Sequence, residues 1–300
     1  NFVVNLNNSL SGTEPFKVFI TPENVPNSWS YNFEINSTIY SDTAVVDITN
    51  GTPLAAAIHV TPGADAGLGK FTLTMISVNN PDASPKKFEV YVIHNITDLI
   101  VRGSGSWGDG LEYNFDQVFN DAMIETGCTT WANTNTDIMK KAFDADVMVD
   151  VNNIYLNIGW SFPTLTDDEA NSLMNFMDNG GNVFMSGQDI GWDIGSGDGY
   201  GTNVTKQFFK DYIHAKFVND GSSSNSSIVS IAYPFENVGT STLSYAYGST
   251  NFYPDQIDTL GGSTCIFTYN TATKKAGVRY HNDTFKTVYL GVGLEMLGDV

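Results

Sequence analysis

Two different hydrophobic periods divide this chain, and they constrain its fold more than any other feature. In residues 29–35, 71–75 and 88–92, apolar and polar side chains alternate one by one. Such alternation is typical of a strand with one buried and one solvated face. Turn-forming Pro, Gly and Asn residues separate these segments, with no helical period between them. Residues 1–96 are therefore predicted to form an all-β sandwich of the immunoglobulin-like (Ig-like) type.

From Asp98 onward, strand patterns alternate with helical ones. One helical stretch has Phe115, Val118 and Phe119 at i, i+3 and i+4, and another opens with a capping box at residues 166–169. Strands are expected at 99–102, 128–131, 154–158 and 183–185, helices at 115–127, 166–179 and 204–216, and β structure again beyond 216. The alternation predicts a second domain over residues 97–300, of the α/β class with a parallel sheet covered on both faces.

The composition is acidic and rich in small polar residues. Of the 300 residues 41% are hydrophobic and 16% charged, and 14 Lys+Arg against 33 Asp+Glu give a net charge of -19. The apolar share suffices for packed cores, while the negative charge repels phosphate backbones and anionic lipids. No run approaches the roughly 18 apolar residues of a membrane-spanning helix. We therefore expect no nucleic-acid partner and no direct membrane insertion.

Several features favour an extracellular or cell-surface protein. The chain starts at Asn1 without an initiator Met, and residues 290–300 leave a predicted strand as the sequence stops, so we expect a fragment of a longer exported chain. Cys128 and Cys265 form either one long-range disulfide or two buried thiols, and we expect thiols. Candidate N-glycosylation sequons begin at Asn7, Asn36, Asn50, Asn95, Asn203, Asn225 and Asn282.

The segment from Ile154 to Asp193 carries a resemblance to a known family. It reads Ile158-Gly-Trp-Ser-Phe-Pro-Thr-Leu-Thr-Asp-Asp-Glu169 and then Asn179-Gly-Gly-Asn-Val-Phe-Met-Ser-Gly-Gln-Asp-Ile-Gly-Trp-Asp193, and residues 208–218, 253–254 and 288–295 continue the likeness. It resembles the class I glutamine-amidotransferase-like (flavodoxin-like) domain of large secreted bacterial and archaeal proteins. Such domains occur beside protease domains, Ig-like modules and C-terminal sorting domains, and as a group they have no established activity.

The resemblance also implies where catalytic residues would lie. Active members of the superfamily carry a Cys nucleophile at the strand-to-helix bend where this chain has Ser186, and a His-x-Glu base where it has Glu295 and no His. Cys128 belongs to an early strand, the wrong place for a nucleophile. A serine needs a base beside it, and His214 or His281 would have to supply it. Otherwise Ser186 and Gln188 hold a tight turn, and both histidines are structural.

The loop after Ser186 is rich in Gly and Asp and offers two binding hypotheses. Asp189, Asp193 and Asp198 could hold calcium through hard oxygen ligands, although their spacing fits no known calcium loop. Aromatic residues at predicted strand ends, with an adjacent amide, form a candidate ligand rim suited to carbohydrate: Trp107, Trp160, Gln188 and Trp192. Packing and a solvated loop are the alternatives. The sequence contains no convincing phosphate loop and no zinc-ligand cluster.

These observations predict a non-catalytic binding or scaffolding fragment of a larger secreted or cell-surface protein. Its expected partners are other domains of the same exported chain, cell-surface proteins or glycans, and no cofactor is required unless calcium binds. Two alternatives remain. One is a serine hydrolase or amidase that uses Ser186, and the other is an accessory region of an extracellular protease.

Overall fold

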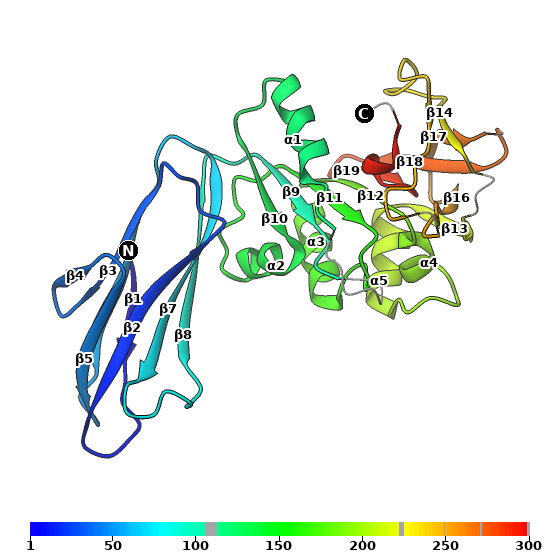
Figure 1. Ribbon diagram of the computed structural model, residues 1–300. Coiled ribbons are helices and arrows are strands. Elements are labelled where there is room, and N and C mark those ends of the chain that lie inside the picture. The colour runs from blue at the N-terminus through cyan, green and yellow to red at the C-terminus, as the bar shows by residue number, and fades with distance from the viewer. Residues whose placement is uncertain (106–112, 222–224, 249, 271, 299–300) are drawn as a thin grey trace. The chain divides into compact units, whose positions relative to one another are not determined.

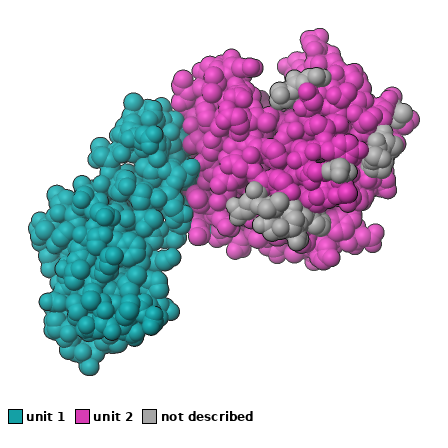
Figure 2. Space-filling view, viewed as in Figure 1, with its two compact units in different colours: residues 1–96, 144–148 teal, residues 97–143, 149–300 magenta. Residues whose placement is uncertain are grey.

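The computed structural model describes residues 1–105, 113–221, 225–248, 250–270 and 272–298 (Figure 1). The chain divides into two compact units, coloured separately in Figure 2. Unit 1 comprises residues 1–96 and 144–148, and unit 2 comprises residues 97–143 and 149–300. Each unit has its own sheets and core. That the predicted domains, 1–96 and 97–300, fold independently stays a prediction.

Unit 1 is built from two four-stranded antiparallel sheets. The first has the order β1 (Phe2–Leu6), β6 (Leu54–Thr61), β3 (Ser30–Ile35), β4 (Thr38–Tyr40). The second has the order β5 (Thr43–Thr49), β2 (Thr13–Glu23), β7 (Gly67–Ser77), β8 (Lys86–His94). The one-by-one alternation of the sequence thus produced the expected all-β body, and its Ig-like assignment stays a prediction.

The core of unit 1 takes alternate residues from both sheets. Phe33 and Ile58 from one sheet and Val18 and Phe71 from the other are fully buried in one hydrophobic cluster. Complete burial of such side chains stabilises the folded state by about 1.5–3 kcal/mol each. Trp29 closes this cluster, and its indole N–H donates to the Asp65 carbonyl at 2.9 Å.

Unit 2 is organised around one 11-stranded mixed sheet. Its parallel part has the order β10 (Trp131–Asn135), β9 (Asp98–Arg102), β11 (Asn153–Gly159), β12 (Asn182–Gly187), β19 (Lys286–Leu290). The antiparallel part continues through β18 (Lys275–His281), β17 (Thr264–Tyr269), β14 (Ser227–Ser230) and β15 (Thr240–Thr242), with β16 (Gln256–Thr259) pairing β18 and β13 (Ala215–Asn219). The strand ends of the parallel part position the candidate site.

Helices cover the parallel part. They are α1 (Asp116–Glu125), α2 (Thr136–Asp144), α3 (Asp167–Asp178), α4 (Ile190–Gly195) and α5 (Asn203–Gln207), with a π-helical turn at Phe208–Tyr212 and a 3₁₀ turn at Leu294–Met296. On one face of the sheet, α1 packs Phe119 and Met123 against Ile100, and α2 and α3 lie on the other side of these strands (Figure 1). The capping box that starts α3 is confirmed: Thr166 Oγ1 accepts from the Glu169 amide, and the Glu169 carboxylate accepts from the Thr166 amide.

The predicted fold class, α/β of the flavodoxin-like type with a parallel sheet, is wrong. Strands account for 42% of the structure and helices for only 17%, and antiparallel sheets in unit 1 join a mixed sheet in unit 2. The prediction followed the strand and helix alternation of residues 98–187 and gave too little weight to the β-rich remainder. That remainder extends the sheet with antiparallel strands instead of adding further strand and helix repeats.

Three element boundaries also differ from expectation. The helix predicted at 204–216 ends at Tyr212 and β13 begins at Ala215, because His214 takes a left-handed backbone conformation (φ 56°) that a helix cannot continue. The strand expected at 128–131 begins only at Trp131. Helix α2 was not predicted, although its buried Met139 and Ala142 lie three residues apart as on one helix face.

Among the described residues, no helix combines the length and apolar character needed to cross a bilayer. The asparagines of the candidate sequons are exposed at Asn7, Asn36, Asn50, Asn95, Asn203 and Asn282. Asn225 differs, because it is only 3% exposed and its side-chain oxygen accepts from Lys274 Nζ at 3.2 Å. A glycan on Asn225 is therefore incompatible with this fold.

Candidate functional site

The carboxyl ends of the parallel strands place a row of polar side chains on one face of the sheet. Arg102, Asn157 and Ser186 are in register across β9, β11 and β12. Residues in register on neighbouring strands point to the same face. Asp116, the first residue of α1, reaches this row and accepts from Arg102 Nη1 at 3.1 Å. The sequence therefore folds four dispersed polar residues into one cluster, which we call the polar row.

Three of these residues contain buried oxygen atoms without a partner. Asp116 Oδ1, Asn157 Oδ1 and Ser186 Oγ make no hydrogen bond within the described part of the chain, and their residues are 7%, 3% and 0% exposed. Burial raises the pKa of Asp116, while Arg102 opposes this shift. An unsatisfied buried polar atom costs about 1–3 kcal/mol. The polar row is thus suited to groups that donate hydrogen bonds.

Ser186 has no general base beside it. Neither predicted imidazole bonds to it: His214 stacks on the Tyr280 ring at 3.5 Å between centroids, and His281 Nδ1 accepts from Arg279. A serine hydroxyl without a base is a poor nucleophile. The geometry therefore supplies no catalytic pair for the hydrolase hypothesis.

Glu295 lies beyond the end of β19, in the short 3₁₀ turn, and is paired with a tyrosine. The Tyr247 hydroxyl donates to Glu295 Oε1, while Glu295 Oε2 has no partner among the described residues. Burial is the largest cause that raises the pKa of both groups. The Tyr247 ring contacts the Tyr113, Phe115 and Trp160 rings. Where the resemblance implies a His beside Glu295, this chain thus has a neutral phenol.

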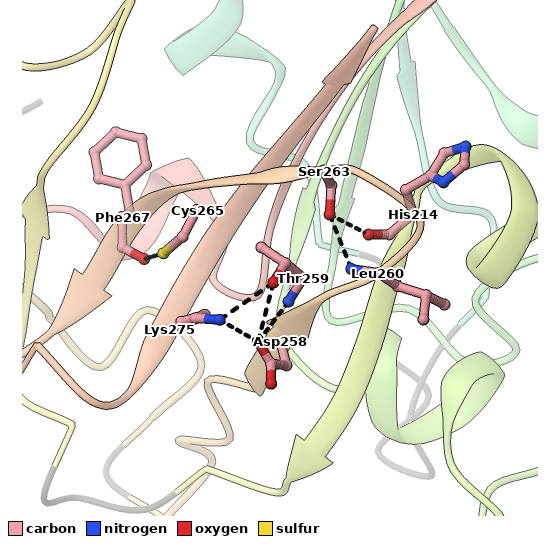
Figure 3. Close-up of polar contacts among 8 residues, drawn as sticks. All are labelled: His214, Asp258, Thr259, Leu260, Ser263, Cys265, Phe267 and Lys275. Atoms are coloured by element: carbon pink, nitrogen blue, oxygen red, sulfur yellow. Dashed lines mark hydrogen bonds and ion pairs between the residues drawn. The ribbon is translucent and has the colours of Figure 1, made fainter.

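His214 marks the junction between the π-helical turn and β13. Its carbonyl accepts from Ser263 Oγ at 2.7 Å and from the Leu260 amide at 3.1 Å. Figure 3 shows the imidazole turned away from these contacts. Burial lowers the pKa of His214, which favours the neutral ring. The residue has a structural role at this bend.

Figure 3 also shows Cys265, whose Sγ lies 3.3 Å from the Phe267 carbonyl oxygen. Cys128 and Cys265 are both free thiols rather than a disulfide, and both are partly rather than fully buried. Burial raises the pKa of Cys265. A thiol held in its protonated form is a weak nucleophile and metal ligand, so neither catalysis nor metal binding is expected from Cys265.

Beside the polar row lies an open pocket of about 210 Å³. It is lined by Trp160, Asp189, Trp192, Asp220 and Tyr253, and we call it the Trp160 pocket. The Trp160 indole N–H donates to Asp189 Oδ2 at 2.6 Å, which fixes this ring. The Trp160 and Tyr253 rings are near-parallel, at 27° and 5.9 Å between centroids. The structure therefore joins two predicted rim tryptophans with one predicted calcium candidate.

The other predicted rim residues have different positions. Gln188 is buried and supports the pocket from behind, since its Oε1 accepts from the Tyr253 amide at 2.9 Å. Trp107 lies outside the described residues. Tyr253 and Asp220 were not predicted for this site, and only the Tyr253-Pro254 part of the family resemblance hinted at the first of them.

The carboxylates that cluster are not the three predicted for calcium. Asp189 joins Asp220 and Asp255, with ligand-capable oxygens all within 4.8 Å of one another. Asp193 is buried instead beneath the Thr164 amide, from which it accepts at 2.9 Å, and Asp198 is exposed. Asp220 and Asp255 follow β13 and precede β16, and the pairing of these two strands brings them to Asp189. We call Asp189, Asp220 and Asp255 the acidic cluster.

Asp255 anchors the acidic cluster and is already satisfied by the protein. It is fully buried and accepts from the Gly191 amide at 2.6 Å, the Trp192 amide at 3.3 Å and the Tyr289 hydroxyl at 3.2 Å. Burial, followed by the neighbouring charge of Asp189, raises its pKa well above the usual value. Burial likewise raises the pKa of Asp189 to about 7. Buried carboxylates at such distances reduce their repulsion by keeping protons.

No protein-family model matches this chain, and no curated protein matches its sequence. Solved structures resemble it weakly. The N-terminal domain of mmIFT52 has 9% identity and a TM-score of 0.42, over 67% of this chain and 88% of that one. A putative ThuA-like protein from Bacteroides uniformis ATCC 8492 has 12% identity and a TM-score of 0.41, over 68% and 83%. The N-terminal domain of PorA has 10% identity and a TM-score of 0.25, over 30% and 71%.

The ThuA-like neighbour has the class I glutamine-amidotransferase-like fold that the sequence resembles. With every TM-score below 0.5, these likenesses carry no argument about the fold or activity of this chain. None of them shows an Ig-like domain. The functional argument therefore depends on the site itself.

Proposed function

We propose that this chain is a non-catalytic binding module of a larger exported protein and that its Trp160 pocket binds a neutral sugar. The observation that carries the proposal is the lining of this pocket, in which three aromatic rings and two carboxylates meet at an opening. Aromatic faces pack on the apolar face of a sugar ring, and carboxylate oxygens accept hydrogen bonds from its hydroxyls.

The size and rigidity of the pocket support a single sugar unit. About 210 Å³ is below the roughly 300–1,000 Å³ of sites for drug-sized ligands. Trp160 is held by Asp189, and Tyr253 is held by Gln188, so two of the three rings are positioned before a ligand arrives. Preorganised contacts lose less entropy on binding. The pocket thus suits the terminal residue of a glycan.

The proposed setting is the cell surface or the extracellular space, with glycans, cell-surface proteins or other domains of the same chain as partners. The net charge of -19 and the exposed sequons are compatible with this setting. The missing base beside Ser186 supports a binding role over the hydrolase alternative. An accessory role beside a protease domain would be one use of such a module.

The proposal is tested by calorimetric titration of the protein with neutral monosaccharides and short neutral glycans. Trp192→Ala should weaken binding by roughly tenfold or more, because a lost aromatic contact of about 1.4 kcal/mol changes affinity tenfold. Tyr233→Ala is the matched control, since Tyr233 is 68% exposed and does not line the pocket. Absence of binding to any neutral sugar, or equal binding by Trp192→Ala, would contradict the proposal.

A further inference from the structure

A second cavity in unit 2 has a different chemical character from the Trp160 pocket. It has a volume of about 530 Å³, and its lining includes Tyr233, Pro234, Arg279, His281 and Lys286. It shares no lining residue with the Trp160 pocket. We call it the Arg279 cavity. No carboxylate contributes to its lining.

The strand register brings the cationic side chains of this cavity together. Arg279 pairs with Val288 and His281 pairs with Lys286 across the antiparallel strands β18 and β19. Directly opposed residues, and residues two apart on one strand, share a face. Arg279, His281 and Lys286 therefore stand side by side, and Tyr233 approaches from the preceding segment with its ring 5.8 Å from the Arg279 guanidinium carbon.

These cations lack the partners expected in so acidic a chain. Acidic residues outnumber Lys and Arg by 33 to 14. The ion pairs among the described residues nevertheless use other Lys and Arg residues: Lys70, Arg102, Lys140, Lys210 and Lys275. Neither Arg279 nor Lys286 has an ion pair in the described part of the chain. The site thus keeps its positive charge available.

The hydrogen bonds of Arg279 define which donors face a ligand. Arg279 can only donate, so its 3.3 Å contact with His281 makes Nδ1 the acceptor and leaves the imidazole proton on Nε2. Arg279 Nε is buried and has no partner among the described residues. The cavity therefore combines guanidinium, imidazole and ammonium donors with an exposed tyrosine ring.

We propose that the Arg279 cavity binds a small organic acid, with its carboxylate on Arg279 and Lys286 and its ring on Tyr233. The planar guanidinium fork matches the two oxygens of a carboxylate. The volume exceeds that of a carboxylate alone, and the Tyr233 and Pro234 side chains supply an apolar wall for a ring. This site is independent of the proposed sugar site.

Titration of the intact chain with D-glucuronate, acetate, sulfate and D-glucose tests the inference. D-glucuronate should bind most tightly, acetate more weakly because it has no ring, and D-glucose at least about tenfold more weakly because it has no charge. If D-glucose matches D-glucuronate, the anion site is overturned. If sulfate matches D-glucuronate, the preference for a carboxylate is overturned.

Variants locate the binding. Arg279→Gln should weaken D-glucuronate binding by about tenfold or more, and Lys286→Gln by several-fold, as expected for charge-assisted hydrogen bonds. Lys216→Gln is the control, because Lys216 is exposed on β13 and does not line the cavity. Thermal unfolding of each variant verifies folding. Unchanged binding by both Arg279→Gln and Lys286→Gln, or an equal loss in Lys216→Gln, would refute the site.

Discussion

Ser186 and Ser263 differ in what their hydroxyl groups contribute to the fold. Ser263 Oγ donates to the His214 carbonyl at 2.7 Å and accepts from the Leu260 amide at 3.0 Å. Ser186 Oγ is completely buried and has no partner among the described residues. A hydroxyl that gains no hydrogen bond on folding retains its desolvation cost. The two serines therefore form a matched pair for mutation.

Ser186→Ala should leave the free energy of unfolding unchanged or raise it by up to about 1 kcal/mol, because it removes an unsatisfied polar atom. Ser263→Ala should lower it by roughly 1 kcal/mol, because it removes two hydrogen bonds. Urea unfolding of both variants measures these values. A hydrolytic activity of the purified chain that disappears in Ser186→Ala would show instead that this hydroxyl is a nucleophile.

The acidic cluster makes stability depend on pH through Asp189. Its pKa rises from 3.8 in the unfolded chain to about 7 in the fold, so the folded state binds more protons between these values. The contribution of Asp189 is fully present below pH 3.8 and is lost as pH rises through 7. Asp189→Asn should therefore stabilise the protein relative to wild type by on the order of 2 kcal/mol at pH 8, and by much less at pH 4.

Thermal unfolding of Asp189→Asn from pH 4 to pH 8 provides this measurement, and Asn is well suited to the left-handed backbone at position 189 (φ 60°). Asp198→Asn is the control, because Asp198 is exposed and outside the cluster. A difference from wild type that does not grow with pH would contradict the assignment. Calcium that stabilises wild type at pH 8, but not Asp189→Asn, would assign the cluster to a metal ion instead.

At the residue scale the sequence located only part of the Trp160 pocket. Trp160, Asp189 and Trp192 were found because they follow strands whose ends meet at one edge of a parallel sheet. Asp220 and Asp255 could not be found, because strand pairing rather than sequence spacing brings them to Asp189. The partnership of Glu295 with Tyr247 was hidden for the same reason.

At the scale of elements, local signals predicted well and long-range ones did not. The strands at 99–102, 154–158 and 183–185 and the helix that follows residue 166 are confirmed, since apolar periodicity and capping act within a few residues. The early end of the helix at Tyr212 depends on the backbone of His214 and on the pairing of β13 with β16. Tertiary pairing there overrode the helical pattern.

Helix α3 offers a direct test of local determinants. Thr166→Ala should lower the free energy of unfolding by about 1 kcal/mol, because the Glu169 amide loses its cap. Ser172→Ala, within the same helix, is the control and should have little effect, since Ala favours helix and the Ser172 bond to the Asp168 carbonyl is exposed. Chemical unfolding measures both. Equal losses in the two variants would show that the capping box does not stabilise α3.

At the scale of the whole molecule, the division of the sequence near residue 97 had physical causes that the fold class lacked. The change of hydrophobic period is a property of each segment alone, whereas the sheet of unit 2 depends on which distant strands pair. The β-rich residues after 216 carried the signal for strands, but not for their antiparallel order beside β19. The extracellular location and the partners likewise remain proposals, because charge and sequons do not specify an address.

The central claim, that the Trp160 pocket binds a neutral sugar, is tested most directly by the indole N–H signals of the tryptophans in a nitrogen–proton NMR titration. The signals of Trp160 and Trp192 should shift saturably with a neutral mono- or disaccharide, while that of Trp29, which donates to Asp65 in unit 1, should not move. If the Trp160 and Trp192 signals remain still with every sugar tried, or if Trp29 shifts equally, the claim is contradicted.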